Sequence, residues 1–268
     1  MSNHLLRSHA PLSDSNWKLL DEEARERLEV ALAARKLVDF SGPHGWEHSA
    51  TNLGRVQPIA AAPCEGVTAM QRRVLPLVEA RAEFQLRRDE LRDDDRGAAD
   101  VDLAPLDHAA HQIAVSENRV VFHGWPEASI TGIAEASPHH GLQLGSDPSG
   151  YPRPVAGAVE RLLRSGIAGP YALALGYEEY RRVVQTAENG GYPLLDHLRK
   201  IVQGELVWTP GLDGAVVISM RGGDFLLESG QDLSIGYLDH DREVVHLYLE
   251  QSFSFHVATP EAAVPLAP

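Results

Sequence analysis

Cysteine is almost absent from this sequence, which holds only Cys64 among its 268 residues. One thiol cannot form an internal disulfide or a metal site made of several cysteines. Long apolar runs are also missing, since no stretch approaches the roughly 18 consecutive apolar residues of a membrane-spanning helix. The N-terminus has no apolar core of signal-peptide length before Ser13 and Asp14. These absences predict a cytoplasmic protein without a membrane partner.

Positive charge is scarce as well. The chain has 24 Lys and Arg residues against 38 Asp and Glu residues, so its formal net charge is 24 − 38 = −14. Nucleic acids and anionic membranes bind clustered cations, so nucleic acid is not an expected partner. Apolar residues make up 43% and charged residues 23%, which is the balance of a folded chain with an ordinary core. This length suits one large domain or two modest ones.

Common catalytic motifs are missing too: G-x-S-x-G, G-x-x-x-x-G-K-[ST] and a G-x-G-x-x-G after a strand do not occur. His44 and His48 do match H-x-x-E-H, the inverted zinc-protease signature. That chemistry needs both histidines on one face of a helix, whereas Gly42, Pro43 and Gly45 predict a turn. A zinc protease is the least favoured alternative, and we expect no catalytic residue, no metal and no cofactor.

Two amphipathic helices are predicted in the N-terminal half. In the first, at 13–36, apolar residues recur at steps of three and four after Ser13 or Asp14, either of which can cap the helix. The second runs over 103–121, with Asp102 as its cap and a glycine beyond its end. Both helices should bury one face against another element.

The segment between these helices, Leu53 to Leu86, has an extended pattern. Apolar and polar residues alternate over 74–86, which is typical of a half-buried strand. A shorter candidate strand lies at 53–59, and prolines and a glycine separate the two. An isolated hairpin with so few apolar residues is marginal, so we interpret this segment as an extended arm that packs on another element or subunit.

The C-terminal half combines helices and strands at 155–202 and is rich in strands beyond 215. Its clearest strand covers 245–257, where apolar and polar residues alternate. Gln251 is the one polar residue on the apolar face. Because this strand is longer than usual, we expect a bend or bulge near Gln251.

Short stretches spread over nearly the whole chain match one known family. They lie at 10–13, 34–39 (Ala-Arg-Lys-Leu-Val-Asp), 42–46 (Gly-Pro-His-Gly-Trp), 84–86, 95–97, 169–171, 191–194 (Gly-Tyr-Pro-Leu), 221–225 (Arg-Gly-Gly-Asp-Phe) and 230–237 (Gly-Gln-Asp-Leu-Ser-Ile-Gly-Tyr). Together they resemble the encapsulins, the prokaryotic nanocompartment shell proteins once described as linocin-type bacteriocins (family 1).

The resemblance implies an α+β fold, that of the major capsid protein of tailed bacteriophages of the Hong Kong 97 type. Such a subunit has a peripheral domain, an axial domain and an extended loop. The implied segments are 1–52 for the N-terminal helix and the start of the peripheral domain, 53–87 for the extended loop, 88–129 for the peripheral spine helix, 130–217 for the axial domain, and 218–268 for the peripheral return strands.

The same resemblance implies a function without catalysis. Such subunits self-assemble into an icosahedral shell, usually of sixty copies (T=1), around a cargo enzyme such as a dye-decolourising peroxidase or a ferritin-like protein. The cargo carries a C-terminal targeting peptide that docks on the inner wall. A prophage major capsid protein is the main alternative, although the net charge of −14 and a fold that starts at Ser13, without room for a scaffolding segment, disfavour it.

Two sets of site residues follow from the resemblance. The positions implied for peptide docking are Leu32, Arg35, Asp39, Leu233, Ile235 and Tyr237. Those implied for a pore on the five-fold axis are Glu188, Asn189, Gly190, Gly191 and Tyr192. In this hypothesis the apolar side chains form pockets for the peptide, and the two charged ones pair its polar groups. It expects Arg35→Glu to give intact shells without cargo.

Overall fold

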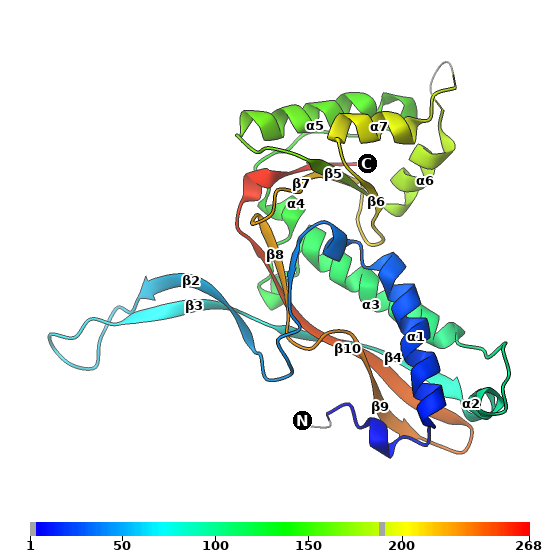
Figure 1. The fold of residues 1–268 in the computed structure, drawn as a ribbon. Coiled ribbons are helices and arrows are strands. Elements are labelled where there is room, and N and C mark those ends of the chain that lie inside the picture. Colours follow the sequence, from blue (N-terminus) through cyan, green and yellow to red (C-terminus); the bar gives the residue numbers. More distant parts are fainter. Residues whose placement is uncertain (1–3, 188–190) are drawn as a thin grey trace.

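The computed structural model describes residues 4–187 and 191–268. Figure 1 shows two regions, one above the other, and an arm that leaves the lower region on one side. The helices are α1 (Asp14–Ala31), α2 (Arg88–Asp95), α3 (Ala104–His123), α4 (Ile133–Ala136), α5 (Pro152–Arg164), α6 (Tyr177–Gln185) and α7 (Leu194–Val202). The strands are β1 (Asp39–Ser41), β2 (Ala50–Pro58), β3 (Met70–Pro76), β4 (Val78–Arg87), β5 (Tyr171–Leu175), β6 (Leu206–Trp208), β7 (Ala215–Ser219), β8 (Phe225–Ser229), β9 (Ser234–His240), β10 (Val244–Val257) and β11 (Ala263–Leu266).

A five-stranded sheet forms the lower region. Its order is β1-β8-β10-β4, and β9 also pairs with β10. The strand β10 is its centre, because it pairs with β4 along most of its length, with β9 over its first half and with β8 over its last residues. The helices α1 and α3 cover one face of this sheet (Figure 1) and bury a cluster that includes Leu20, Leu106 and Leu247. Residues far apart in the chain thus share one core.

The upper region is built on a four-stranded sheet of order β11-β7-β5-β6. Every residue of β5 and β7 is buried, which means that both faces of this sheet are covered. The helices α5 and α7 lie over this sheet, and α6 lies at its side (Figure 1). The core of this region extends into the lower sheet through Phe253 and Phe255 of β10. One strand therefore contributes to both cores.

Local sequence signals explain most of the helix ends. Ser13 caps α1, because its Oγ accepts a hydrogen bond from the backbone N of Asn16, whose side chain accepts one from the backbone N of Ser13. The expected helix at 13–36 ends at Ala31, and a short 3-10 turn follows at Ala34–Lys36. The second expected helix is α3, although it begins after Leu103. The backbone of that residue occupies the cap position.

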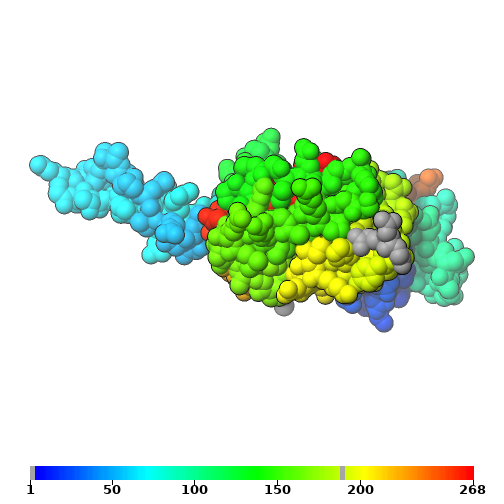
Figure 2. Space-filling view, turned by 90° about the horizontal axis from the view of Figure 1, so that it is seen from above, coloured from blue at the N-terminus to red at the C-terminus, as the bar shows by residue number. Residues whose placement is uncertain are grey.

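The strands β2 and β3 form an arm that projects well clear of the body (Figure 2). The arm carries several large apolar side chains that are exposed, namely Val56, Ile59, Val67, Met70 and Val74. The strand β4 differs from the expectation of one extended segment at 53–87, since it pairs with β10 inside the main sheet. Leu77 separates β3 from β4, and its backbone N donates a hydrogen bond to Ser49 O at 3.0 Å.

The bulge expected near Gln251 is wrong. Residues 244–253 pair with β4 in continuous register through Gln251, and the register of β10 shifts instead between His246 and Leu247, opposite β9. Gln251 is buried, and its Oε1 accepts a hydrogen bond from Arg35 at 3.0 Å. A polar partner inside the core therefore explains this residue without a bulge.

Among the described residues, no helix has the length and apolar character needed to cross a lipid bilayer.

Candidate docking groove

A groove of about 610 Å³ lies between α1 and β9. We call it the docking groove. Its apolar lining consists of Ala24, Leu28, Leu32, Leu233, Ile235 and Leu249. Its polar lining consists of Arg7, Asp21, Arg25, Glu29, Arg35, Asp232 and Ser234.

The floor of the docking groove is apolar because two stripes face each other across it. Ala24, Leu28 and Leu32 follow one another at intervals of four along α1 and its exit, which places them on one face of the helix. Ile235 and Leu249 are paired across β9 and β10. All five are buried, whereas Leu233 at the mouth is partly exposed. The groove thus presents an apolar floor on which a side chain of a partner could pack.

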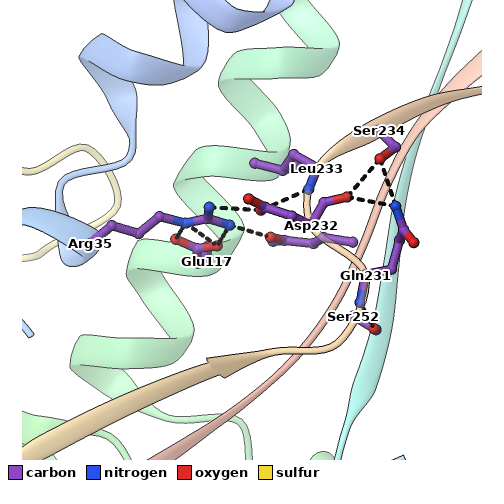
Figure 3. Close-up of polar contacts among 8 residues, drawn as sticks. Arg35, Glu117, Gln231, Asp232, Leu233, Ser234 and Ser252 are labelled. Atoms are coloured by element: carbon purple, nitrogen blue, oxygen red, sulfur yellow. Dashed lines mark hydrogen bonds and ion pairs between the residues drawn. The ribbon is translucent and has the colours of Figure 1, made fainter. Parts of the chain in front are cut away.

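Arg35 forms one end of the docking groove and is held by three elements (Figure 3). Its Nε and Nη2 donate to the carboxylate of Glu117 on α3, the nearest distance being 2.8 Å. Its Nη1 donates to Asp232 at 2.8 Å, and its Nη2 also reaches Gln251. The guanidinium lies 4.6 Å from the centre of the Phe40 ring. Most of its donors are therefore already used within the subunit.

Burial alone would lower the pKa of Arg35, but the hydrogen bonds and negative charges of Glu117 and Asp232 outweigh burial and raise it. Glu117 is fully buried, so this ion pair neutralises a carboxylate that water does not reach. Arg35 is therefore a support of the groove wall more than a free cation at its mouth.

The loop before β9 is fixed by a second set of hydrogen bonds (Figure 3). The carboxylate of Asp232 accepts the backbone N of Leu233 at 2.8 Å, and its backbone O accepts the hydroxyl of Ser234 at 2.8 Å. Gln231 is held by Ser234 and Ser252. This wall of the docking groove is therefore preorganised.

Four of the six predicted docking residues line the groove: Leu32, Arg35, Leu233 and Ile235. The other two, Asp39 and Tyr237, lie outside the groove lining. Asp39 accepts a hydrogen bond from the backbone N of Gly223 at 2.6 Å, on the far side of β8. Tyr237 is buried, and its hydroxyl bonds to His240 at 2.5 Å. Asp39 thus stabilises the turn before β8, and Tyr237 packs within the main sheet.

Sequence reasoning missed several charged residues of the groove rim. Arg7 lies there because it pairs with Asp21 at 2.7 Å and stacks over Trp17 at 4.0 Å. Asp21, Arg25 and Glu29 share one helical face, as their spacing of four indicates. This spacing is the sequence pattern that could have identified the three residues as neighbours on the rim. Arg25 and Glu29 are exposed, and no ion pair is found for either within residues 4–187 and 191–268.

Of the predicted pore residues, Glu188, Asn189 and Gly190 lie outside the described residues. Gly191 has a φ of 80°, a conformation that favours glycine. Tyr192 is 38% exposed, and its ring centre lies 5.0 Å from Lys200 Nζ. Hydrogen bonding to Tyr192 raises the pKa of Lys200.

The two histidines of the zinc-protease alternative lie in the loop between β1 and β2, on either side of a turn at Trp46 and Glu47, and not on a helix. His44 Nε2 is 3.0 Å from Ser41 Oγ, and His48 Nε2 is 2.6 Å from Glu228 Oε1. Within the part of the chain that the structure describes, no group of three or more side chains is arranged to hold a metal ion.

Known proteins share both sequence and fold with this chain. A family model described as "Encapsulating protein for peroxidase" matches residues 2–254. The chain is 48% identical to a type 1 encapsulin shell protein of Rhodospirillum rubrum, over 98% of this chain and 96% of the relative. It is 39% identical to a type 1 encapsulin shell protein of Mycobacterium tuberculosis, over 99% of each chain.

Solved structures support the fold. A virus-like particle from Pyrococcus furiosus matches with a TM-score of 0.65 at 16% identity and covers 94% of this chain and 99% of its own. The capsid protein of Myoviridae phage XM1 matches with a TM-score of 0.53 at 10% identity and covers 88% of this chain and 91% of its own. These likenesses confirm the expected α+β capsid fold. The curated relatives are structural shell proteins and not enzymes, and the chain belongs with them to the encapsulin shell-protein family.

Proposed function

We propose that sixty copies of this chain close into an icosahedral T=1 shell in the cytoplasm, and that the shell encloses a cargo enzyme held by its C-terminal targeting peptide. Membership of a family of shell proteins supports the shell, and the family description names a peroxidase as an encapsulated protein. A peroxidase or a ferritin-like protein is the cargo that we propose. The predicted segments, from the extended loop at 53–87 to the axial domain at 130–217, remain proposals.

The docking groove is the observation that carries the cargo proposal. Its apolar floor lies between rigid walls, and its volume of about 610 Å³ suits a few side chains of an extended peptide. Burial of one Leu or Ile side chain contributes about 1.5–3 kcal/mol. Two such anchors would therefore give a modest affinity after the cost of ordering the peptide. Many weak sites facing one lumen would hold a multimeric cargo through avidity.

The N-terminal segment limits how a peptide enters the docking groove. The backbone O of Leu5 accepts a hydrogen bond from the backbone N of Tyr237 at 2.9 Å, so this segment already lies beside β9. Arg7 then forms part of the rim. The peptide would lie between this segment and α1, with its apolar side chains directed at Leu32 and Ile235.

The arm formed by β2 and β3 supports self-assembly. A monomer rarely exposes several large apolar side chains on one isolated hairpin, since such a hairpin is marginal in water. Contact with a neighbouring copy would cover them. We also propose that 188–192 surrounds an opening at the five-fold axis, where Tyr192 would contribute an aromatic side chain at its edge.

Electron microscopy of the purified protein tests the shell, and mass spectrometry of co-purifying chains tests the cargo. We expect hollow particles with an enzyme inside when the cargo is expressed whole, and empty particles when its C-terminal peptide is removed. Particles filled with DNA would contradict the proposal and would favour a phage capsid. Equal loading of the truncated cargo would contradict docking through that peptide.

A further inference from the structure

Four arginines gather at the end of the lower region that lies farthest from the second sheet. Arg87 and Arg88 stand at the junction of β4 and α2, and Arg92 lies one turn further along α2. Arg242 belongs to the turn between β9 and β10. Together with Asp89 and Glu243 they line a hollow of about 440 Å³. Figure 1 shows α2 beside the turn that joins β9 to β10, the segments that supply most of these residues. We call it the arginine hollow.

The walls of the arginine hollow are fixed by hydrogen bonds. The backbone N of Arg88 donates to Glu243 O at 2.8 Å, and its Nη1 donates to Asp241 O at 2.8 Å. The carboxylate of Asp241 accepts the backbone N of Glu243 at 2.7 Å and that of Val244 at 2.8 Å. Those bonds lower the pKa of Asp241. The hollow thus joins two anchored segments that come from distant parts of the chain.

The guanidinium groups of the arginine hollow are not all paired within the subunit. Among the lining residues four guanidinium groups outnumber two carboxylates, 4 − 2 = +2, and the carboxylates of Asp241 and Glu90 beside them act on Arg88 and Arg87 and offset this excess. Arg87 takes both oxygens of Asp89 and lowers the pKa of that carboxyl to about 2. Arg88 bonds to a neutral carbonyl. Across the described residues, the guanidinium groups of Arg92 and Arg242 have no ion-pair or hydrogen-bond partner.

Clustered guanidinium groups with spare donors are the usual recognition element for phosphate, because two N–H groups of one arginine match two phosphate oxygens. Each phosphate group brings about 1.5 to 2 negative charges at neutral pH. A chain of phosphate groups would place its oxygens against the unpaired guanidinium groups of Arg92 and Arg242 and occupy the hollow. We propose that the arginine hollow binds an oligophosphate anion, either inorganic or as the phosphate chain of a nucleotide, with Arg92 and Arg242 as its direct ligands.

Calorimetric titration of the purified, assembled particle with sodium tripolyphosphate tests this proposal. Ionic strength is held constant with sodium chloride, because guanidinium–phosphate attraction is screened by salt. We expect saturable binding with at most one anion per subunit. Arg92→Gln and Arg242→Gln should each weaken it about tenfold, the loss expected for a charge-assisted contact. A parallel titration with ATP distinguishes the two sources of the phosphate chain.

Arg153→Gln is the matched control, since Arg153 lines a different surface hollow, beside α5. Circular dichroism melting checks that the variants fold. Absence of saturable heat in the wild type, or equal weakening by Arg153→Gln, would overturn the proposal. A second result would also overturn the proposal: the wild-type particle binds no phosphate, and Arg92→Gln changes particle assembly. In that case carboxylates of a second copy fill the hollow.

Discussion

Arg35, in the turn that follows α1, and Glu117, on α3, form an ion pair of 2.8 Å in which the carboxylate is completely buried. The pair joins the helix that forms one wall of the docking groove to the helix beneath it. Removing one partner of a buried pair leaves the other charge without compensation. The integrity of the subunit therefore depends on Arg35.

Arg35→Met should lower the free energy of unfolding by about 3–5 kcal/mol, the typical cost of breaking a buried ion pair. The Arg35→Glu test expected from the sequence is less suitable, because a second carboxylate would stand against Glu117. Thermal unfolding of the variant measures the effect. Arg25→Met, an exposed position on the neighbouring helix, is the control and should leave the melting temperature nearly unchanged. Equal melting temperatures for the two variants would contradict the structural role.

Leu233→Asn should reduce cargo loading and leave the shell intact. Leu233 is partly exposed at the mouth of the docking groove, so the change removes an apolar contact for the peptide without opening the core. A loss of about 1.5 kcal/mol corresponds to roughly a tenfold weaker affinity. The ratio of cargo to shell in purified particles, measured by densitometry, checks this. Val30→Asn, an exposed residue on α1 outside the groove, should load normally.

Val56→Glu should block assembly but not folding. Val56 lies on the arm with 54% of its surface exposed, so a charge there disturbs little within the subunit and opposes burial against a neighbour. Size-exclusion chromatography should show free subunits, and circular dichroism should show native secondary structure. Gln57→Glu places the same charge on the adjacent arm residue and separates the effect of position from that of charge. Normal particles of Val56→Glu would refute a buried contact for this side chain.

Acid should destabilise the subunit partly through His123, at the end of α3. Burial lowers the pKa of His123 below 6.5, Arg119 lowers it further, and only Asp213 opposes the shift. Its Nε2 accepts the backbone N of Asp213 at 3.1 Å, which requires an unprotonated nitrogen. Below about pH 6.5 the unfolded chain binds more protons than the folded one, so stability falls as pH falls towards the folded pKa.

His123→Gln keeps an acceptor at this position but does not titrate. The decrease in melting temperature between pH 7.5 and 5.5 should be smaller in this variant than in the wild type. His111→Gln, at an exposed position on the same helix, should retain the full decrease. An unchanged pH dependence in His123→Gln would exclude this residue as a source of acid sensitivity.

Local patterns predicted local structure well. The helix expected at 103–121 is α3, Ala104–His123, since its apolar stripe and the following Gly124 are both encoded nearby. The arm was predicted to begin near Leu53, but nothing local shows that β4 pairs with β10. Strand pairing depends on residues more than 150 positions away. The interruption between β3 and β4 at Leu77 likewise depends on a hydrogen bond to a residue distant in the sequence, Ser49.

The docking groove could be predicted only in part. Its leucines belong to stripes that the sequence shows, and the resemblance directed attention to Arg35. Arg7 and Asp232 reach the groove through contacts over long separations, with Asp21 and with Arg35. Gln251 was misinterpreted for the same reason, because its partner lies 216 residues away in the chain. Contacts between residues that are far apart in the sequence leave no periodic pattern from which they could be predicted.

The strand β10 has 14 residues and therefore extends about 46 Å at the usual rise of 3.3 Å per residue. Its first half belongs to the core beneath α1 and α3, and Phe253 and Phe255 belong to the other. A load applied at the arm passes through β4 into this strand by a ladder of ten paired positions. Tension that reaches β10 is then carried along the backbone of this strand from one core to the other. The two regions of the subunit are thus joined by covalent bonds and not only by the packing of side chains.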